Sequence, residues 1–219
     1  MDVIYISTPH NTHIGYLRKA LKNGKHVLCE KSITLNSAEL SEAAELAREH
    51  HVVLAEAMTI YHMPIYRRLL DIGVYALSLA RWFFSETPDQ ITSQVRFAPT
   101  GVDEQASILL MNPKEEMAGI TLSLHAKQPK RATLSYDRAY IEIFEYPRAS
   151  EAVITWTEDG RKEVLREGDT KMALSYEVSD MEKTILTGED AMYLSYSRDV
   201  MKIMTKLRQD WGMKYPEEE

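Results

Sequence analysis

The chain has 219 residues, of which 44% are hydrophobic, so it can form one large domain or two smaller ones with a sizeable core. The formal net charge of −7 argues against nucleic acid or an anionic membrane as the main partner. No apolar run is long enough to span a bilayer, and the first residues carry no basic region, so we expect no secretory signal. The single cysteine, Cys29, cannot form an internal disulfide, which favours a reducing compartment and predicts a cytoplasmic protein.

Three short apolar runs near the start of the chain alternate with two helical patterns. The predicted strands cover residues 2–7, 26–30 and 52–58. Asn11 or Thr12 can cap the first helix and Gly24 ends it, whereas Asn36 with Glu39 resembles a capping box for the second. Connections of this length suit parallel strands joined by right-handed crossovers. The pattern therefore predicts half of a doubly wound nucleotide-binding sheet.

Polar residues stand where each of these strands leaves the sheet. They are Thr8-Pro9-His10, Glu30-Lys31 and Glu56. Parallel strands end at one shared edge, and open α/β sheets bind their ligands beyond that edge. A surface ion pair between Glu30 and Lys31 is the alternative, and such a pair contributes little. The clustering of three strand ends favours a binding site that includes Lys31.

A glycine-rich turn normally holds the phosphates of a dinucleotide in such a sheet. The nine glycines of this chain are scattered, and no two of them stand at G-x-G spacing. The sequence therefore predicts weak or absent dinucleotide binding by this chain.

The second half changes from helical to alternating patterns. Helices are predicted from Tyr61 to Leu70 and from Ala76 to Phe84. Alternating segments between residues 90 and 166, separated by turn residues, predict an antiparallel meander with one packed face. Two more helices are predicted, within residues 176–186 and 193–211. Asp71 and Tyr75 are four residues apart and would share a helix face, with or without a chemical role.

The segment Thr8-Pro9-His10-Asn11-Thr12-His13, followed by Gly24-Lys25-His26-Val27-Leu28-Cys29-Glu30-Lys31, resembles the signature of the Gfo/Idh/MocA oxidoreductases. Glu56-Ala57-Met58 and Asp71-Ile72-Gly73-Val74-Tyr75 resemble the branch with dihydrodiol dehydrogenase and D-xylose dehydrogenase. The resemblance implies an α/β plus α+β fold: a partial Rossmann-like parallel sheet over residues 1–60, then an open, mainly antiparallel sheet domain with flanking helices over residues 61–219. The latter would bind substrate and mediate oligomerisation, and its last helix would pack back on the first domain.

The resemblance also implies an NAD(P)-dependent oxidation of a sugar, polyol or dihydrodiol hydroxyl. Lys31 matches the lysine near the nicotinamide, Tyr75 the acid/base tyrosine and Asp71 its companion acid. The matching cofactor-binding positions are Thr8, Pro9, His10, Glu30 and Lys31. A free tyrosine has a pKa of about 10, and we expect a neighbouring lysine to lower the pKa of Tyr75.

Three features depart from the family pattern. Ser32 stands where the family usually has proline, the glycine-rich first half of the Rossmann domain is missing, and an internal loss is expected near residues 69–72. We therefore expect an oxidoreductase whose cofactor site is incomplete and which is inactive as this chain alone. A non-catalytic module that dimerises through the open sheet is the alternative, and a third reading is that the missing segments exist in the native protein.

Other sites rank lower. His10, His13, His50 and His51 have no cysteine or carboxylate cluster to complete a metal site, so we expect no metal. Cys29 is interpreted as a small buried apolar residue. The sequence does not distinguish NAD from NADP, nor one small-molecule hydroxyl substrate from another.

Overall fold

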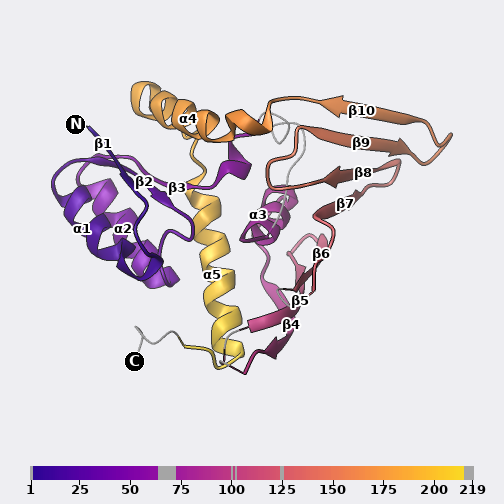
Figure 1. The fold of residues 1–219 in the computed structure, drawn as a ribbon, viewed down its shortest axis with the longest axis horizontal. Helices are drawn as coiled ribbons and strands as arrows, with labels where there is room; N and C mark the ends of the chain where they lie inside the picture. The colour runs from indigo at the N-terminus through magenta and orange to yellow at the C-terminus, as the bar shows by residue number, and fades with distance from the viewer. Residues whose placement is uncertain (1, 64–72, 100, 102, 124–125, 215–219) are drawn as a thin grey trace.

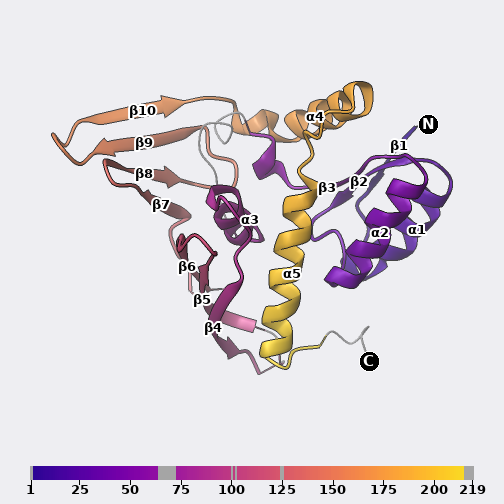
Figure 2. The same cartoon turned by 180° about the vertical axis from the view of Figure 1, so that it is seen from behind.

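The computed structural model describes residues 2–63, 73–99, 101, 103–123 and 126–214. A small α/β unit at the N-terminus and two antiparallel sheets lie on opposite sides of one long helix, α5 (Leu194–Asp210), and both views show this arrangement (Figures 1 and 2). No helix within the described ranges is long and apolar enough to cross a membrane.

The N-terminal unit confirms the predicted alternation of strands and helices. Its strands are β1 (Val3–Ile6), β2 (His26–Glu30) and β3 (Leu54–Ala57), and its helices are α1 (His13–Lys22) and α2 (Ser37–Glu49). The strands are parallel in the order β1-β2-β3. Apolar side chains from both helices bury against the sheet, with Leu17, Leu21, Val27 and Leu40 at most 1% exposed. This burial is the main force that holds the unit together.

Local signals set the ends of α1 and α2, with the predicted cap by Thr12 as the exception. Gly24 follows α1 with a φ of +66°, which glycine adopts without steric cost. The Asn36 side chain caps α2 by accepting a hydrogen bond from the Glu39 amide at 3.0 Å. The Glu39 carboxylate accepts a hydrogen bond from the Leu35 amide at 3.0 Å. Thr12 precedes α1 but makes no side-chain cap, because its hydroxyl bonds Thr8 and Pro9 instead.

The second half begins with α3 (Gly73–Phe83), where a helix was predicted from Ala76. Seven antiparallel strands follow: β4 (Gln90–Phe97), β5 (Asp103–Met111), β6 (Met117–Ser123), β7 (Arg131–Ser135), β8 (Ala139–Phe144), β9 (Glu151–Trp156) and β10 (Lys162–Arg166). The predicted alternation is confirmed, but the described strands form two sheets, β4-β5-β6 and β10-β9-β8-β7, rather than one meander. A cavity of about 640 Å³, lined by Leu79 and Phe83 of α3, separates β6 from β7.

The two C-terminal helices confirm their predictions. Helix α4 (Ala173–Thr187) ends at Gly188, which has a φ of +73°, and α5 then runs back between the two halves (Figure 1). Met201 packs into the core of the N-terminal unit, whereas Val200 and Ile203 pack with α3 and the β4-β5-β6 sheet. The Arg208 guanidinium donates to the Leu35 carbonyl at 2.6 Å, which also ties α5 to the segment before α2.

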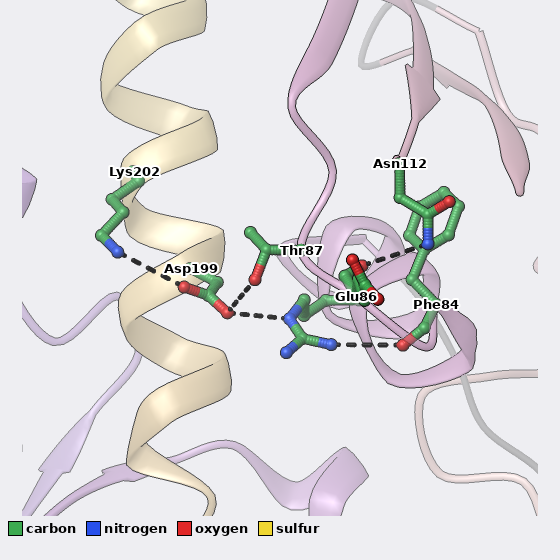
Figure 3. A network of polar contacts seen from close by, with 7 residues as sticks. Phe84, Glu86, Thr87, Asn112, Asp199 and Lys202 are labelled. Carbon is green, nitrogen blue, oxygen red and sulfur yellow. Dashed lines mark hydrogen bonds and ion pairs between the residues drawn. The ribbon is translucent and has the colours of Figure 1, made fainter. Parts of the chain in front are cut away.

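A polar network fixes α3 against α5 (Figure 3). The Arg81 Nε donates to Asp199 Oδ2 at 2.9 Å, and the Thr87 hydroxyl donates to the same oxygen at 2.8 Å. Lys202 approaches the other carboxylate oxygen at 3.5 Å. Burial alone would raise the pKa of Asp199, but the hydrogen bonds from Arg81 and Thr87 outweigh it and lower that pKa. The ionised form of Asp199 is therefore the one that the fold stabilises.

Asp199→Asn should lower the free energy of unfolding by about 1–3 kcal/mol at pH 7, because a charge-assisted hydrogen bond is lost. The pKa of Asp199 is lower in the folded state, so its contribution is present above a pH of about 4 and is lost as the pH falls through the folded-state value. Urea unfolding at several pH values measures the free energy of unfolding of both proteins. Asp210→Asn is the matched control, since Asp210 makes an exposed pair with Lys206 on the same helix and should change stability by less than about 0.5 kcal/mol. A pH-independent effect of Asp199→Asn would contradict this account.

Candidate active site

The carboxyl ends of the three parallel strands meet at one edge, as predicted. Ile6 pairs with Cys29 and Cys29 with Glu56, so the residues that follow each strand leave the sheet side by side. The predicted candidates Thr8, Glu30 and Glu56 are therefore brought to a common edge.

The buried imidazole of His13 ties two of the strand-end loops together. Its Nε2 lies 2.9 Å from the Thr8 carbonyl and its Nδ1 lies 3.2 Å from the Ser32 carbonyl. The neighbouring His10 Nε2 lies 2.8 Å from the Thr34 carbonyl. His13 and His10 therefore hold the loop after β1 against the loop after β2 through these hydrogen bonds. No group of three or more His, Cys, Asp or Glu in the described part of the chain could hold a metal ion.

Lys31 is exposed at the end of β2, and the Lys31–Ser32 peptide bond is cis although Ser32 is not proline. The positive charge of Lys31 acts on Glu56, a buried acid that accepts a hydrogen bond from the Ile33 amide at 3.0 Å. Burial raises the pKa of Glu56, and the charges of Lys31 and His13 oppose that rise.

Tyr75 lies half-buried in the first turns of α3, with its phenol near Thr59. Burial raises the pKa of Tyr75; Thr59 and the charge of Arg148 oppose the rise, whereas the charges of Glu177 and Glu30 add to it. The direction is opposite to the one expected from a neighbouring lysine. Tyr75 is therefore a neutral phenol near pH 7 and can donate a proton rather than accept one. Asp71, its predicted companion, lies outside the described residues, as do residues 69–72, where the internal loss is expected.

Two residues of this edge escaped the sequence analysis. Tyr5 of β1 donates a short hydrogen bond to the Glu30 carboxylate, and burial together with that bond raises the pKa of Tyr5. Glu177 of α4 is 2% exposed, and burial followed by the charge of Glu30 raises its pKa to about 8. A signal existed for Glu177, since an acid on the apolar face of an amphipathic helix is unusual, but its partners come from distant parts of the chain.

Cys29 is fully buried in the middle of this region, next to the charges of Glu56 and Glu30. Burial and these two acids raise the pKa of its thiol, so the thiolate is strongly disfavoured. This confirms the interpretation of Cys29 as an apolar core residue rather than a nucleophile.

The donor set at this edge fits the nicotinamide and ribose end of a dinucleotide. It presents the Thr8 hydroxyl, the Glu30 carboxylate and the Lys31 ammonium group at the carboxyl ends of parallel strands. It does not fit the phosphates equally well, because the chain has no closely spaced glycine pair to let a pyrophosphate approach the backbone.

Comparisons with known proteins point to one family. The family described as "Oxidoreductase family, NAD-binding Rossmann fold" (GFO_IDH_MocA) matches residues 1–58, and the GFO/IDH/MocA C-terminal domain matches residues 67–143. The trans-1,2-dihydrobenzene-1,2-diol dehydrogenase of Xenopus laevis is 25% identical over 99% of this chain and 80% of its own length. The scyllo-inositol 2-dehydrogenase (NADP(+)) IolU of Bacillus subtilis is 24% identical over 98% of this chain and 79% of its own length.

Solved structures share the fold at lower identity. UDP-N-acetylglucosamine 3-dehydrogenase GnnA from Acidithiobacillus ferrooxidans has a TM-score of 0.81 and 19% identity over 94% of this chain and 77% of its own. KijD10, a 3-ketoreductase from Actinomadura kijaniata in complex with NADP and TDP-benzene, has a TM-score of 0.82 and 19% identity over 95% of this chain and 78% of its own. The alignment with the Xenopus laevis relative spans 264 positions, so at least 45 of them lack a counterpart among the 219 residues here. This agrees with an internal loss.

His13→Ala should lower the free energy of unfolding by about 2–4 kcal/mol, because it removes a buried ring and leaves the Thr8 and Ser32 carbonyls without their partner. Urea unfolding measures the change. His50→Ala is the control, since His50 is exposed at the end of α2 and should change stability by less than about 0.5 kcal/mol. Equal stability of the two variants would show that other contacts hold these loops.

Proposed function

Because this chain belongs to the Gfo/Idh/MocA oxidoreductase family, we propose that it interconverts a hydroxyl and a carbonyl group on a sugar, polyol or dihydrodiol with NAD or NADP. The names of the dihydrodiol and inositol dehydrogenase relatives support this substrate class. The buried, unpaired cysteine and the family membership support a cytoplasmic location.

One observation carries the proposal: Tyr75 of α3 packs against the core cluster that contains Met58, the residue that follows β3 at the edge where the parallel strands end. In the family pattern the lysine after the strand-end glutamate, here Glu30, lies near the nicotinamide and the substrate hydroxyl, and a tyrosine is the acid/base. We therefore assign these two roles to Lys31 and Tyr75, and to Asp71 the role of orienting Tyr75. The cofactor would lie against Thr8, Pro9, His10, Glu30 and Lys31.

The chemistry follows from the protonation states. A bound dinucleotide would supply or accept the hydride. A neutral Tyr75 donates its proton to the oxygen of a carbonyl substrate, while the ammonium group of Lys31 stabilises negative charge on that oxygen. The raised pKa of Tyr75 therefore favours the reductive direction near neutral pH.

Tyr75→Phe should lower turnover of a dihydrodiol, inositol or aldose substrate by at least about 100-fold, because the general acid is lost. NADPH binding, followed by its fluorescence, should change by less than about threefold, since the phenol is not a dinucleotide contact in this proposal. Tyr136→Phe is the control, because Tyr136 is 55% exposed beyond β7. Unchanged turnover in Tyr75→Phe would overturn the assignment of Tyr75, and wild-type protein that binds neither NADH nor NADPH would overturn the oxidoreductase activity of this chain.

A second candidate function is sheet-mediated association without catalysis. The face of the β4-β5-β6 sheet that is turned away from α3 carries exposed apolar side chains, among them Leu109 (54% exposed) and Met117 (70% exposed). Ile108 and Leu110, on the opposite face, are buried, whereas Leu109 extends over Gly119 of β6 and remains largely exposed. This face suits a second copy of the protein.

Leu109→Glu should convert a dimer to a monomer in sedimentation experiments, because it places a charge in the middle of the apolar face. Thr133→Glu, an exposed position on β7 of the other sheet, is the control and should leave the mass unchanged. A monomeric wild-type protein would contradict the dimer. A dimer that binds no dinucleotide would favour the non-catalytic function.

A further inference from the structure

The two antiparallel sheets leave a gap between β6 and β7, which are consecutive strands. Each of them is the last strand of its sheet, and neither has a second strand partner among the described residues. Both strands lie beside α3 (Figures 1 and 2) and line one cavity of about 640 Å³. An edge strand presents a row of unpaired N–H and C=O groups, so two such rows border the same cavity.

The hydrogen bond that closes the β5–β6 hairpin shows which backbone groups of β6 are unpaired. The Asn112 amide donates to the Glu116 carbonyl at 3.1 Å, and the ladder continues from there in regular register. Successive residues of a strand direct their N–H and C=O groups to opposite edges, so every second residue from Glu116 onward bonds to β5. The residues between them, which include Gly119 and Thr121, therefore direct their backbone groups away from β5.

Two hydrogen bonds identify the unpaired backbone groups of β7 in the same way. The Lys130 carbonyl accepts from the Glu145 amide at 2.7 Å, and the Tyr136 amide donates to the Ala139 carbonyl at 2.9 Å. The even-numbered residues of β7 therefore bond to β8. The odd-numbered residues direct their backbone groups away from β8, and they are Arg131, Thr133 and Ser135. Residues of both rows line the cavity.

The floor of the cavity is apolar and has the size of one strand. Leu79 and Phe83 of α3 line it, together with Ile120 of β6 and Leu134 of β7. A strand of five residues fills about 800 Å³, given about 3.3 Å per residue, about 4.8 Å between strands and about 10 Å between stacked layers. The cavity of about 640 Å³ therefore has room for one strand but not for two.

We propose that the gap between β6 and β7 binds an extended segment of another polypeptide as an additional strand, which joins the two sheets into one. An extended backbone carries donors and acceptors on both of its edges at the spacing of a ladder, so it can satisfy both rows at once. Side chains at every second position of this segment would lie on the floor over Leu79 and Phe83, so these side chains are apolar.

The amount of chain that this protein lacks supports an occupant from elsewhere. At least 45 positions of the alignment with the Xenopus laevis relative have no counterpart among the 219 residues here. The internal loss is expected near residues 69–72, directly before α3, and α3 forms the floor of the gap. A strand can therefore be absent from this chain at the place where two strand edges are left without a partner.

Amide hydrogen exchange, followed by NMR on the full chain, tests the proposal. The probe is the peptide acetyl-Lys-Val-Thr-Val-Thr-Val-Thr-Lys-amide. The control is the same peptide with each threonine replaced by proline, which removes the donors from one edge. With the probe at about 1 mM, the amides of Gly119, Thr121 and Thr133 should exchange at least about tenfold more slowly, because each gains a hydrogen bond. The proline peptide should leave their exchange unchanged.

A variant of β7 tests the role of the backbone. Thr133→Pro removes a donor that points into the gap and leaves the ladder with β8 intact, a position at which an edge strand tolerates proline. We expect it to weaken binding of the probe at least about fivefold. Thr133→Ala is the matched control, because it changes the same side chain, keeps the backbone donor and should bind as the wild-type protein does.

Three results would overturn the proposal. The amides of Gly119, Thr121 and Thr133 could be protected before any peptide is added, in which case β6 and β7 pair with each other or with a second copy. The probe could leave exchange unchanged or slow it on one strand alone, or the proline peptide could slow it equally. If Thr133→Pro does not fold, the comparison of the two peptides on the wild-type protein decides. No dinucleotide takes part, so the outcome is independent of the proposed oxidoreductase function.

Discussion

The structure depends on how two buried carboxyl groups, Glu56 on β3 and Glu177 on α4, are accommodated away from water. Glu56 accepts a hydrogen bond from the Ile33 amide, and Glu30 accepts one from Tyr5. Glu177 has no such partner for one of its oxygens. Burial raises the pKa of Glu56 and of Glu177, and the charge of Glu30 adds to the rise at Glu177. The protonated form of Glu177 is therefore the one that its buried position favours at neutral pH.

Helix α5 makes this packing possible because both halves of the protein bury against it (Figure 2). Arg208 links it to the carbonyl of Leu35 before α2, and Asp199 links it to Arg81 of α3. The Arg81 guanidinium also lies 4.3 Å from the centre of the Tyr196 ring on α5. These contacts fix α3, and with it Tyr75, relative to the strand ends. The position of a phenol in one half is thus determined by a helix that comes last in the sequence.

Most of the fold was predictable from local patterns, because strand alternation, the Asn36 cap and the glycines after α1 and α4 act over a few residues. The division of the antiparallel strands into two sheets was not, since it depends on how β6 and β7 pack around α3. At the site, the convergence of the strand ends followed from parallel topology. Tyr5 and Glu177 were missed. The pKa of Tyr75 was expected to fall, whereas it is raised. All three depend on burial among residues that are far apart in sequence.

The residues proposed to exchange a proton and the glycines that the phosphates of a dinucleotide require belong to different parts of such a fold. The residues to which we assign the proton exchange, Lys31 and Tyr75, follow β2 and lie on α3, and α5 packs against α3. The phosphates of a dinucleotide need closely spaced glycines after a strand, which these 219 residues do not contain. Fold similarity to dehydrogenases persists over 94% of the chain even though relatives carry additional positions. The pKa of Glu177 is therefore raised whether or not the chain binds a cofactor, because burial within the protein, rather than a ligand, is its main cause.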